Sequence, residues 1–346
     1  MEFGKGTLEN LGMRPGFWKN KKVLITGHTG FKGSWLSLWL QKKGAHVIGY
    51  ALTPPTEPNM FGVAGVARNM ISINGDVRDA ARLRYVFAEH QPEVVFHLAA
   101  QAIVRRSYEN PTETYETNIM GTVNVLEAVR NARSVHSAVM ITSDKCYENC
   151  EWVWGYRESD MMGGHDPYSS SKGCAELIIS AYRRSYFSAD LKSEHCASIA
   201  STRAGNVVGG GDWAPDRLIP DILRAFMKAR PVIIRNPKAT RPWQHVLEPL
   251  RGYLMLAEQL WYEGGQFTGG SNFGPNEDDN KPVSWIADRL SALWSDEARW
   301  EKDATEQPHE ANYLKLDCSK SKSLLKWQPL LNLDTTLTWI VEWYKA

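Results

Sequence analysis

The sequence predicts an α/β fold with a doubly wound, parallel sheet of the Rossmann type and a smaller, mixed C-terminal lobe. Two observations support this prediction. Short apolar, β-branched runs alternate with segments of helical periodicity from residue 21 to about residue 208, and such alternation is typical of parallel sheets covered by helices. After residue 208 the chain becomes rich in Gly, Pro, Asn and Trp, and its periodic segments become shorter and more widely spaced.

The first predicted unit is a strand, a glycine turn, a helix and a second strand. KKVLIT at 21–26 is a short buried-strand pattern, and GHTGFKG follows it. SWLSLWLQKK then repeats its apolar residues at helical spacing until Gly44, a residue type that commonly ends helices. AHVIGYAL at 45–52 predicts the second strand. This order makes a β-α-β unit, which implies a parallel sheet with helices on its faces.

The alternation continues and predicts six or seven strands in all. The further strand patterns are NMISINGD, EVVFHLAA, HSAVMITS and CASIASTRAGNVVG, and the helical patterns between them are DAARLRYVFAEHQ, TYETNIMGTVNVLEAVRNA and SSSKGCAELIISAYRRSYF. We therefore expect a loose tail at 1–20, a dinucleotide-binding domain at 21–208 with a returning helix near 248–262, and a substrate lobe at 209–346.

Composition excludes several classes of function. The 40 Lys and Arg residues balance 39 Asp and Glu residues, so no net charge favours binding of a nucleic acid. The five cysteines have no metal-ligand spacing, which predicts reduced thiols and no metal site. The N-terminus lacks a signal-peptide pattern, and no apolar run approaches the length of a membrane span. We therefore expect a cytoplasmic enzyme that does not bind membranes.

The glycine turn predicts a dinucleotide site. Gly27, Gly30 and Gly33 lie between a predicted strand and a predicted helix, where glycines let the backbone approach a pyrophosphate and the helix N-terminus near Phe31 offers free N–H groups. A turn that only packs against the sheet is the alternative. At the end of the second strand, near Leu52, no cationic residue is placed to bind a 2′-phosphate, so we predict NAD rather than NADP.

The reacting groups are predicted at Tyr168 and Lys172. These residues are four positions apart at the start of a helix and share one face, and a nearby ammonium favours the phenolate form of a tyrosine, which can act as a base. Ser143 ends a predicted strand 25 residues upstream and could bind the same substrate oxygen. Asp144 and Lys145 follow directly. A charged pair at the end of a buried strand is unusual unless the two residues take part in binding or catalysis.

These features together resemble the extended branch of the short-chain dehydrogenase/reductase family, which includes nucleotide-sugar epimerases and dehydratases. HLAAQ at 97–101 and Asn118 in ETNIMGT add to the resemblance, which runs from about Lys21 to the C-terminus. The turn and the resemblance together assign NAD binding to Gly27, His28, Gly30, Phe31, Gly33, Asp76, Val77, Leu98, Ala99, Ala100, Asn118, Tyr168 and Lys172. Asp76 has an equal alternative interpretation as the N-cap of the helix that follows it. His97 is interpreted as a buried, hydrogen-bonded histidine rather than a base.

Within that family, GHTGFKGSW, TSDKCY, TRAGNVVGGGDWAPDRLIPD and RPWQHV resemble sugar-nucleotide 4,6-dehydratases. The resemblance implies that Tyr168 deprotonates the 4-hydroxyl group as hydride leaves C4, and that Asp144 protonates the departing 6-hydroxyl group. The family commonly has glutamate after this aspartate, whereas this chain has Lys145. Lys145 could remove the C5 proton if burial lowers its pKa; alternatively it only pairs with Asp144, and a water molecule or Tyr147 moves the proton.

The resemblance further implies a CDP-hexose substrate, with Asn206, Arg217, Arg241 and, less securely matched, Asn272 holding the nucleotide and diphosphate. Arginine suits bidentate contacts with phosphate. A residue of the segment 104–108 is expected to face the sugar. Helices near 114–132 and 170–187 resemble those that join this family into homodimers or homotetramers through a helix bundle.

Three other functions remain open at this point. A nucleotide-sugar 4-epimerase would share Ser143, Tyr168 and Lys172 but would not need Asp144, and a 4,6-dehydratase for another nucleoside diphosphate hexose would share all of these residues. A regulatory protein that binds a dinucleotide without catalysis is the third alternative. Such proteins usually lose the tyrosine or the lysine, and both are present here.

Overall fold

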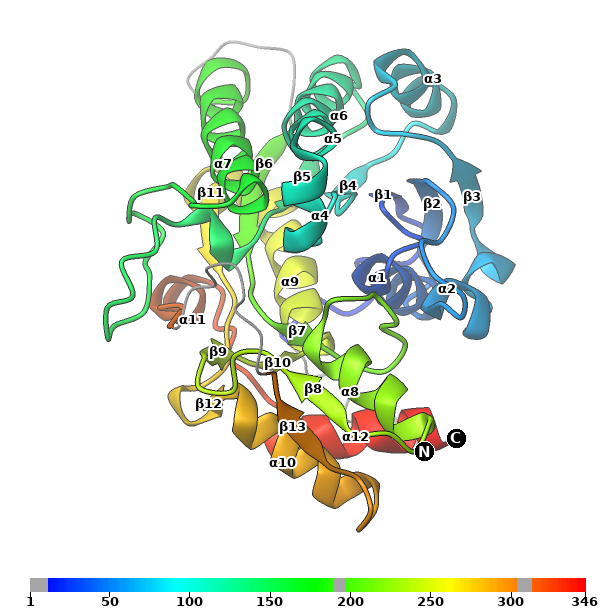
Figure 1. The fold of residues 1–346 in the computed structure, drawn as a ribbon. Helices are drawn as coiled ribbons and strands as arrows, with labels where there is room; N and C mark the ends of the chain where they lie inside the picture. The colour runs from blue at the N-terminus through cyan, green and yellow to red at the C-terminus, as the bar shows by residue number, and fades with distance from the viewer. Residues whose placement is uncertain (1–11, 189–196, 304–312) are drawn as a thin grey trace.

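The computed structural model describes residues 12–188, 197–303 and 313–346. Its centre is a seven-stranded sheet with the strand order β11-β6-β5-β4-β1-β2-β3 (Figure 1), and every pair of neighbouring strands in it is parallel. The predicted doubly wound sheet is thereby confirmed. Its strands are β1 (Lys22–Thr26), β2 (His46–Ala51), β3 (Ile71–Asn74), β4 (Val94–His97), β5 (Ser137–Ile141), β6 (Ser198–Arg203) and β11 (Gly269–Asn272).

The strand order reverses direction at β1, which lies between β2 and β4. The register pairs Thr26 at the end of β1 with His97 at the end of β4, so the segments that follow these two strands leave the sheet side by side. Thr26 Oγ1 and His97 Nδ1 lie 2.7 Å apart. In open α/β sheets the crevice at such a reversal, outside the carboxyl ends of the strands, is where ligands bind.

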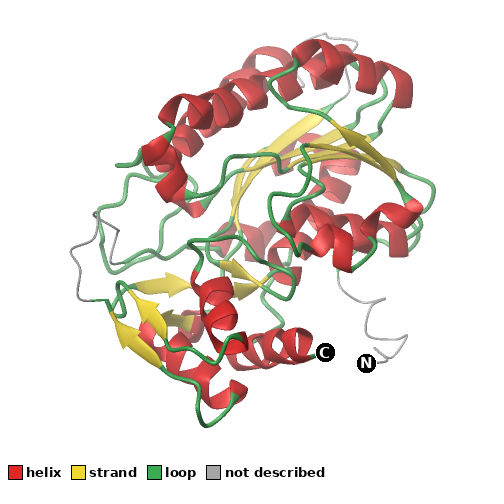
Figure 2. Cartoon of the chain, turned by 45° about the vertical axis from the view of Figure 1, so that its right-hand side comes forward, coloured by secondary structure: helices red, strands yellow, loops and turns green. Residues whose placement is uncertain are grey.

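Helices cover both faces of the sheet (Figure 2). Alternate strand residues point to opposite faces, so Val23, Val94 and Val139 pack against one helical layer, while Leu24 and Val95 pack against the other. The first layer contains α1 (Phe31–Lys42) and α9 (Leu247–Glu263), and the second contains α3 (Ala80–His90), α6 (Gly121–Asn131) and α7 (Pro167–Tyr186).

The helix expected near 114–132 has three parts. α5 (Pro111–Tyr115) continues through the π-helical turn η2 (Glu116–Met120) into α6. The other short helical segments of the first part of the chain are α2 (Met60–Val63), η1 (Val66–Asn69), α4 (Val104–Glu109) and η3 (Asp144–Cys146).

The segments after β6 build a second set of elements around their own apolar cluster, in which Ile222, Ile286 and Leu337 are fully buried. Three two-stranded sheets join β7 with β10, β9 with β12 and β8 with β13. The elements after β6, apart from α9 and β11, are β7 (Val207–Val208), α8 (Leu218–Met227), β8 (Val232–Ile234), β9 (Thr240–Pro242), β10 (Gln244–His245), η4 (Gly264–Phe267), η5 (Glu277–Asp279), β12 (Asn280–Pro282), α10 (Val283–Trp294), β13 (Trp300–Lys302), α11 (Ser319–Leu324) and α12 (Leu333–Lys345).

The seventh strand of the main sheet was missed by the sequence analysis. β11 has the sequence GGSN, which has no strand pattern of its own, and it forms by pairing with β6, where Gly270 lies opposite Ser201. A Cβ atom on Gly270 would lie 2.6 Å from Nη2 of Arg203, so a side chain here would collide with that guanidinium group. The chain thus re-enters the main sheet well after residue 208.

The single strand expected over the sequence CASIASTRAGNVVG is also divided. β6 ends at Arg203, and β7 begins at Val207 and pairs with β10 instead. Between them Asn206 has a φ of +41°, a left-handed conformation that interrupts an extended strand.

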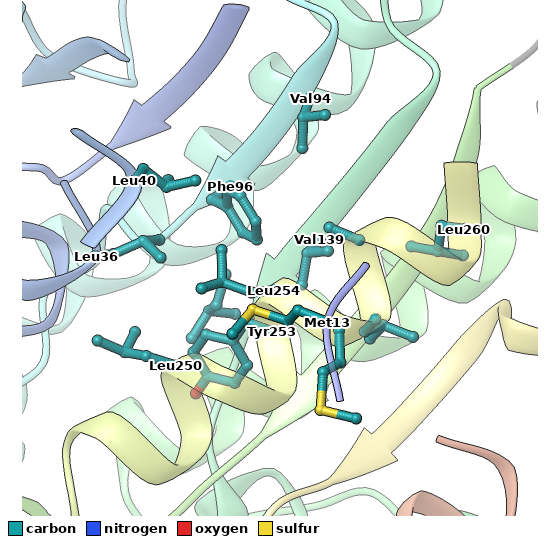
Figure 3. Packing of buried hydrophobic residues seen from close by; sticks show 14 of the residues in the cluster. Met13, Leu36, Leu40, Val94, Phe96, Val139, Leu250, Tyr253, Leu254 and Leu260 are labelled. Carbon is teal, nitrogen blue, oxygen red and sulfur yellow. The ribbon is translucent and has the colours of Figure 1, made fainter. Parts of the chain in front are cut away.

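The prediction of a loose tail at 1–20 is wrong for residues 12–20; residues 1–11 lie outside the described part. Met13, Phe17 and Trp18 are buried in the cluster formed by α1, α9 and the sheet, and Figure 3 shows Met13 beside Leu254 and Tyr253 of α9. The segment 12–20 consists of bends and turns and contains no helix or strand. Its apolar residues therefore follow no regular spacing from which burial could have been predicted. Within the described residues, no helix is long and apolar enough to cross a bilayer.

Candidate active site

The glycine turn joins β1 to α1 at the reversal point of the sheet. Gly27 has a φ of +76°, and a Cβ atom there would lie 2.7 Å from the backbone N of Ala99. A Cβ atom on Gly33 would lie 2.1 Å from the carbonyl O of Gly27, so only glycine allows the turn to close onto α1. The N-cap residue Gly30 makes no side-chain cap, which leaves the N–H groups of the first helical turn available to an anion. These residues fit the pyrophosphate of a dinucleotide.

The His28 side chain lies beneath this turn. It is fully buried, its Nε2 lies 2.8 Å from Ser72 Oγ, and its ring packs so closely on Gly49 that a Cβ atom there would lie 2.3 Å from it. Burial lowers the pKa of His28 to about 4, although a hydrogen bond with the Tyr50 backbone opposes that shift. The ring is therefore neutral, and one of its nitrogens is already used by the protein.

The structure excludes one of the two interpretations of Asp76, and its role in cofactor binding stays a prediction. Its Oδ2 accepts hydrogen bonds from the guanidinium group of Arg78, at 2.6 Å from Nη2, while Asp79 caps α3 by accepting from the backbone N of Arg82. The N-cap interpretation of Asp76 is thus wrong, because α3 begins at Ala80 and Asp79 directly precedes it. Val77 is buried against Gly121 of α6.

Asn118 is held entirely within the protein. Its Oδ1 accepts from the backbone N of Gln101, and its Nδ2 donates to the carbonyl O of Gln101 and to Ser171 Oγ. The Asn118 side chain thus ties the segment after β4 to α7. His97, as interpreted from the sequence, is buried between Thr26 and Thr122, and burial lowers its pKa to about 3.

A pocket of about 370 Å³ opens at the carboxyl end of the sheet, a size that suits a small organic ligand. Its walls come from α1, the segments after β4 and β5, the start of α7, and the second lobe from β7 to β9. The predicted site residues that line it are Phe31, Leu98, Ala100, Ser143, Asp144, Lys145, Tyr168, Lys172, Asn206, Arg217 and Arg241.

Tyr168 and Ser143 meet in this pocket. Burial raises the pKa of Tyr168 to about 12, and the hydrogen bond with the Ser143 side chain and the charge of Arg217 act in the opposite direction. Arg217 is thus a cation near the phenol, which was not predicted from the sequence, and the role of Lys172, which lines the same pocket, stays a prediction. Burial lowers the pKa of Lys172 to about 8, and the charge of Glu176 opposes that shift.

Asp144 is 2 % exposed, and its two oxygens have different surroundings. Oδ1 accepts a hydrogen bond of 2.9 Å from Ser143 Oγ, whereas Oδ2 has no hydrogen-bond partner among the described residues. Burial raises the pKa of Asp144, and the charge of Lys145 opposes that shift. A carboxyl group with a raised pKa and a free oxygen can donate a proton to a bound molecule.

Tyr147 is outside the pocket. Its hydroxyl donates to Asn272 Oδ1 at 2.8 Å and accepts from Arg203 Nη1 at 2.7 Å. Burial raises its pKa, and both hydroxyl contacts lie within the protein, so the oxygen is not directed at the pocket. The structure therefore argues against the alternative in which Tyr147 moves the C5 proton.

Gly205 borders the carboxylate of Asp144, and we predict that Gly205→Ala impairs turnover. The new Cβ atom would lie 1.8 Å from Asp144 Oδ2 and 2.3 Å from its Cγ, so the carboxylate must move within a buried site. A misplacement of about 1 Å commonly costs about a hundredfold in rate, and we expect a loss of that size in steady-state assays. Gly265→Ala is the matched control, because its Cβ atom would have no neighbour within 4 Å. Equal activity of the two variants would contradict the placement of Asp144.

Lys32 is a pocket residue that the sequence analysis missed. It is the second residue of α1 and lines the pocket with Lys172 and Arg217. Burial and the charges of those two cations lower its pKa to about 7, and the charge of Asp144 opposes that shift. Its signal in the sequence was a charged residue directly after Phe31, at the entry of a helix expected to pack against a dinucleotide.

The predicted diphosphate residues separate into two groups. Arg217 donates from Nη1 to Asp212 Oδ2 at 2.9 Å, and Arg241 lies in the wall of the pocket with only 8 % exposure. Asn206 also faces the pocket. Asn272, in contrast, is fully buried on β11, and its Nδ2 donates to the carbonyl O atoms of Tyr156 and Asp317. This placement contradicts substrate binding by the Asn272 side chain, because its amide is used within the core.

Further charged residues of the pocket were not assigned from the sequence. From the segment 104–108, Val104 and Arg105 line the pocket. Arg105 Nη1 lies 3.3 Å from Asp216 Oδ1, and Arg235 Nη1 lies 3.9 Å from the same oxygen. These residues come from separate parts of the chain, so only the fold brings them together. Among residues 12–188, 197–303 and 313–346, no group of three His, Cys, Asp or Glu side chains could hold a metal ion; Cys196 lies outside these ranges.

Comparison with known proteins shows the family and the fold of the chain. Residues 24–339 match the family described as GDP-mannose 4,6-dehydratase. CDP-glucose 4,6-dehydratase of Salmonella typhimurium strain LT2 is 57% identical over 330 residues, which cover 95% of this chain and 92% of that protein. Among solved structures, an epimerase from Methanothermobacter thermautotrophicus is similar with a TM-score of 0.82 at 24% identity, covering 97% of this chain and 96% of the other. dTDP-glucose 4,6-dehydratase from Bacillus anthracis, in complex with NAD, has a TM-score of 0.76 at 21% identity, with coverages of 94% and 96%. The two structural likenesses concern the fold.

Proposed function

The chain belongs to the GDP-mannose 4,6-dehydratase family, and on this premise we propose that it converts CDP-D-glucose into CDP-4-dehydro-6-deoxy-D-glucose and water. The observation that carries the proposal is the meeting of Asp144 and Lys145 with Ser143, Tyr168 and Lys172 in one pocket. A nucleotide-sugar 4-epimerase would need only the last three of these residues. The identity of 57% with a CDP-glucose 4,6-dehydratase supports the choice of nucleotide.

The cofactor is NAD, which when bound supplies a hydride acceptor for C4 and a hydride donor for C6. The glycine turn and the N-terminus of α1 would hold its pyrophosphate, and Tyr168 and Lys172 would flank the reacting end. The preference for NAD over NADP comes from the sequence, which has Leu52 where a 2′-phosphate would need a cation; Leu52 is exposed after β2, and its carbonyl O accepts a hydrogen bond from Thr29 Oγ1.

The residues of the pocket divide the proton transfers between them. Tyr168 accepts the proton of the 4-hydroxyl group, while Ser143 hydrogen-bonds the same oxygen. The ketone at C4 acidifies the C5 proton, which Lys145 removes. Asp144 gives its proton to the 6-hydroxyl group, which leaves as water. The elimination thus removes the C5 proton and the 6-hydroxyl group as one molecule of water. The hydride taken from C4 would then return to C6 while C5 regains a proton, which balances the proton that Tyr168 took from the 4-hydroxyl group.

The second lobe would hold the nucleotide. We propose that Arg217 and Arg241 bind the diphosphate and that Asn206 contacts the nucleotide, because these side chains line the pocket beside the reacting groups. In this proposal residues 209–346 form mainly a substrate lobe. Two elements of that range, α9 and β11, belong instead to the dinucleotide-binding part. We further propose that the protein works in the cytoplasm.

A homodimer or homotetramer is part of the proposal. α6 and α7 pack beside each other on the outer side of the sheet. Leu177 and Met120 on this surface are 61% and 50% exposed, and Tyr186 and Tyr115 are also exposed. Such a patch of large apolar side chains suits an isologous interface between two copies.

The substrate assignment can be tested with a panel of CDP-, dTDP-, UDP- and GDP-hexoses. We expect only CDP-D-glucose to yield a product with the alkali-induced absorbance of a 4-keto-6-deoxy sugar. A C4 epimer without this absorbance would instead indicate an epimerase, and turnover of another nucleoside diphosphate glucose would contradict the choice of cytidine.

A further inference from the structure

A buried carboxylate lies one helical turn after Lys172. Glu176 is on α7 at 5% exposure, four residues from Lys172 and on the same face of the helix. It does not line the pocket and has no part in the proton transfers proposed above. A carboxylate is rarely so deeply buried unless it is paired.

Three donors satisfy Glu176, one from the residue directly after β5 and two from β6. Its Oε1 accepts from Thr142 Oγ1 at 2.5 Å, and its Oε2 accepts from Ser201 Oγ at 2.7 Å and from Arg203 Nη2 at 2.8 Å. Thr142 directly precedes Ser143 at the end of β5, and the other two donors are on β6. One carboxylate therefore links the helix that carries Tyr168 and Lys172 to the strand end that carries Ser143 and Asp144.

The second guanidinium nitrogen of Arg203 contacts the segment that follows β5. Its Nη1 donates to Tyr147 OH at 2.7 Å and to the carbonyl O of Glu158 at 3.1 Å. The guanidinium group also lies 5.0 Å from the centre of the Tyr147 ring. The ion pair of Glu176 and Arg203 has only 4% and 5% side-chain exposure. Removing one partner of such a pair leaves the other charge buried and uncompensated.

The charges around Lys172 come from several elements. Glu176 faces it from its own helix and Cys146 from η3; Lys32 of α1 and His97 of β4 feel its charge. Of these groups, Glu176 is the foremost influence that raises the pKa of Lys172, against the burial that lowers it to about 8. Burial would raise the pKa of Glu176, yet Arg203 and the two hydroxyl groups hold it below its ordinary value, so the carboxylate stays charged.

We propose that Glu176 is a positioning residue that keeps the Lys172 amine protonated and fixes the end of β5 against α7. The inference rests on the proposed function for its catalytic consequence, but the charge on Lys172 can be measured without turnover. Without the carboxylate, Lys172 and Arg203 both lose the negative charge of Glu176 while they stay buried. The protonated form of Lys172 then becomes less favourable, so its titration moves to lower pH.

The test is an NMR titration of the full chain, saturated with NAD and labelled with ¹³C at the lysine ε carbons, with Lys172→Met to assign the signal. In Glu176→Gln we expect the Lys172 midpoint to fall by about one pH unit, the lower end of what an opposite charge at close range contributes. In a plot of the rate of CDP-D-glucose turnover against pH, the decline on the alkaline side is likewise expected to move to lower pH. An unchanged midpoint in folded Glu176→Gln would overturn the proposal.

Glu248→Gln is the matched control. Glu248 is also buried, pairs with Arg251 at 3.5 Å and accepts the N–H groups of Leu330 and Leu331, but it belongs to α9 and is not part of the pocket. We expect this variant to lose stability while the Lys172 midpoint stays at the wild-type value. An equal shift in both variants would mean that general destabilisation, not the Glu176 charge, sets the midpoint, and would also overturn the proposal.

Glu176→Asp covers the case in which Glu176→Gln does not fold. It keeps the charge but holds it one methylene further back, so its midpoint is expected between those of the wild type and the glutamine variant. A wild-type midpoint in Glu176→Asp, with no folded glutamine variant, would count against the proposal. If the wild type fails to turn over CDP-D-glucose, the proposed function is refuted while the titration still decides the role of Glu176.

Discussion

Replacement of Asp144 by asparagine is expected to lower formation of the 4-keto-6-deoxy product by about 10²–10⁴-fold, the range that a positioned acid or base contributes. Asparagine keeps the shape of the side chain and can still accept the hydrogen bond from Ser143 Oγ at Oδ1, but it has no proton to give to the 6-hydroxyl group. Oxidation at C4 does not depend on that proton. Reduced nicotinamide should therefore still appear, and a stopped-flow trace of its near-ultraviolet absorbance would detect it.

Asp334→Asn serves as the control for Asp144→Asn. Asp334 is in the first turn of α12, pairs with Arg289 and does not line the pocket, so its loss should leave turnover unchanged. Unimpaired dehydration by the Asp144 variant would exclude Asp144 as the proton donor. Loss of C4 oxidation together with dehydration would contradict the assignment of separate roles.

Replacement of Tyr168 by phenylalanine is expected to remove both steps. In the proposed mechanism the phenol oxygen takes the proton of the 4-hydroxyl group, so without it neither the ketone nor the elimination should follow. We expect a loss of about 10²–10⁴-fold in the appearance of reduced nicotinamide as well as in product formation. This pattern differs from that of Asp144→Asn, and measuring both signals on the same samples separates the two roles.

Tyr85→Phe is the control for this variant. Tyr85 is 65% exposed on α3, and removal of its hydroxyl group should change neither signal. If Tyr168→Phe still reduced the cofactor at the wild-type rate, another base would have to act on the 4-hydroxyl group. Binding of NAD, measured by calorimetry, would show whether the phenylalanine variant keeps an intact cofactor site.

The sequence could predict the six strands up to Arg203 because each is a local pattern. Buried strands of a parallel sheet are continuous apolar runs, and the helices between them repeat at the helical period. The glycine turn was predictable for a similar reason, since Gly27 and Gly33 must lack a Cβ atom at this point of the chain. The pair of Tyr168 and Lys172 follows from spacing on a single helix.

The errors share one physical cause, which is that their elements depend on distant partners. β11 forms only because β6 supplies a strand to pair with, and Trp18 is buried only because α9 and the sheet provide a cavity for it. Asn272 matched a family pattern, but its direction is set by Tyr156 and Asp317. Lys32 became visible as a pocket residue only when Arg217 and Lys172 were placed beside it.

The sequence by itself determined the first six strands of the main sheet and the helices between them, the phosphate turn and the chemical types of the reacting groups, because these depend on neighbours within one or two turns of the chain. Tertiary structure alone decided which side chains face the pocket and what charge they carry. Burial raises the pKa of Asp144 and lowers that of Lys172, and charged groups from other parts of the chain oppose both shifts. Those interactions depend on distance in space, which spacing along the chain does not specify.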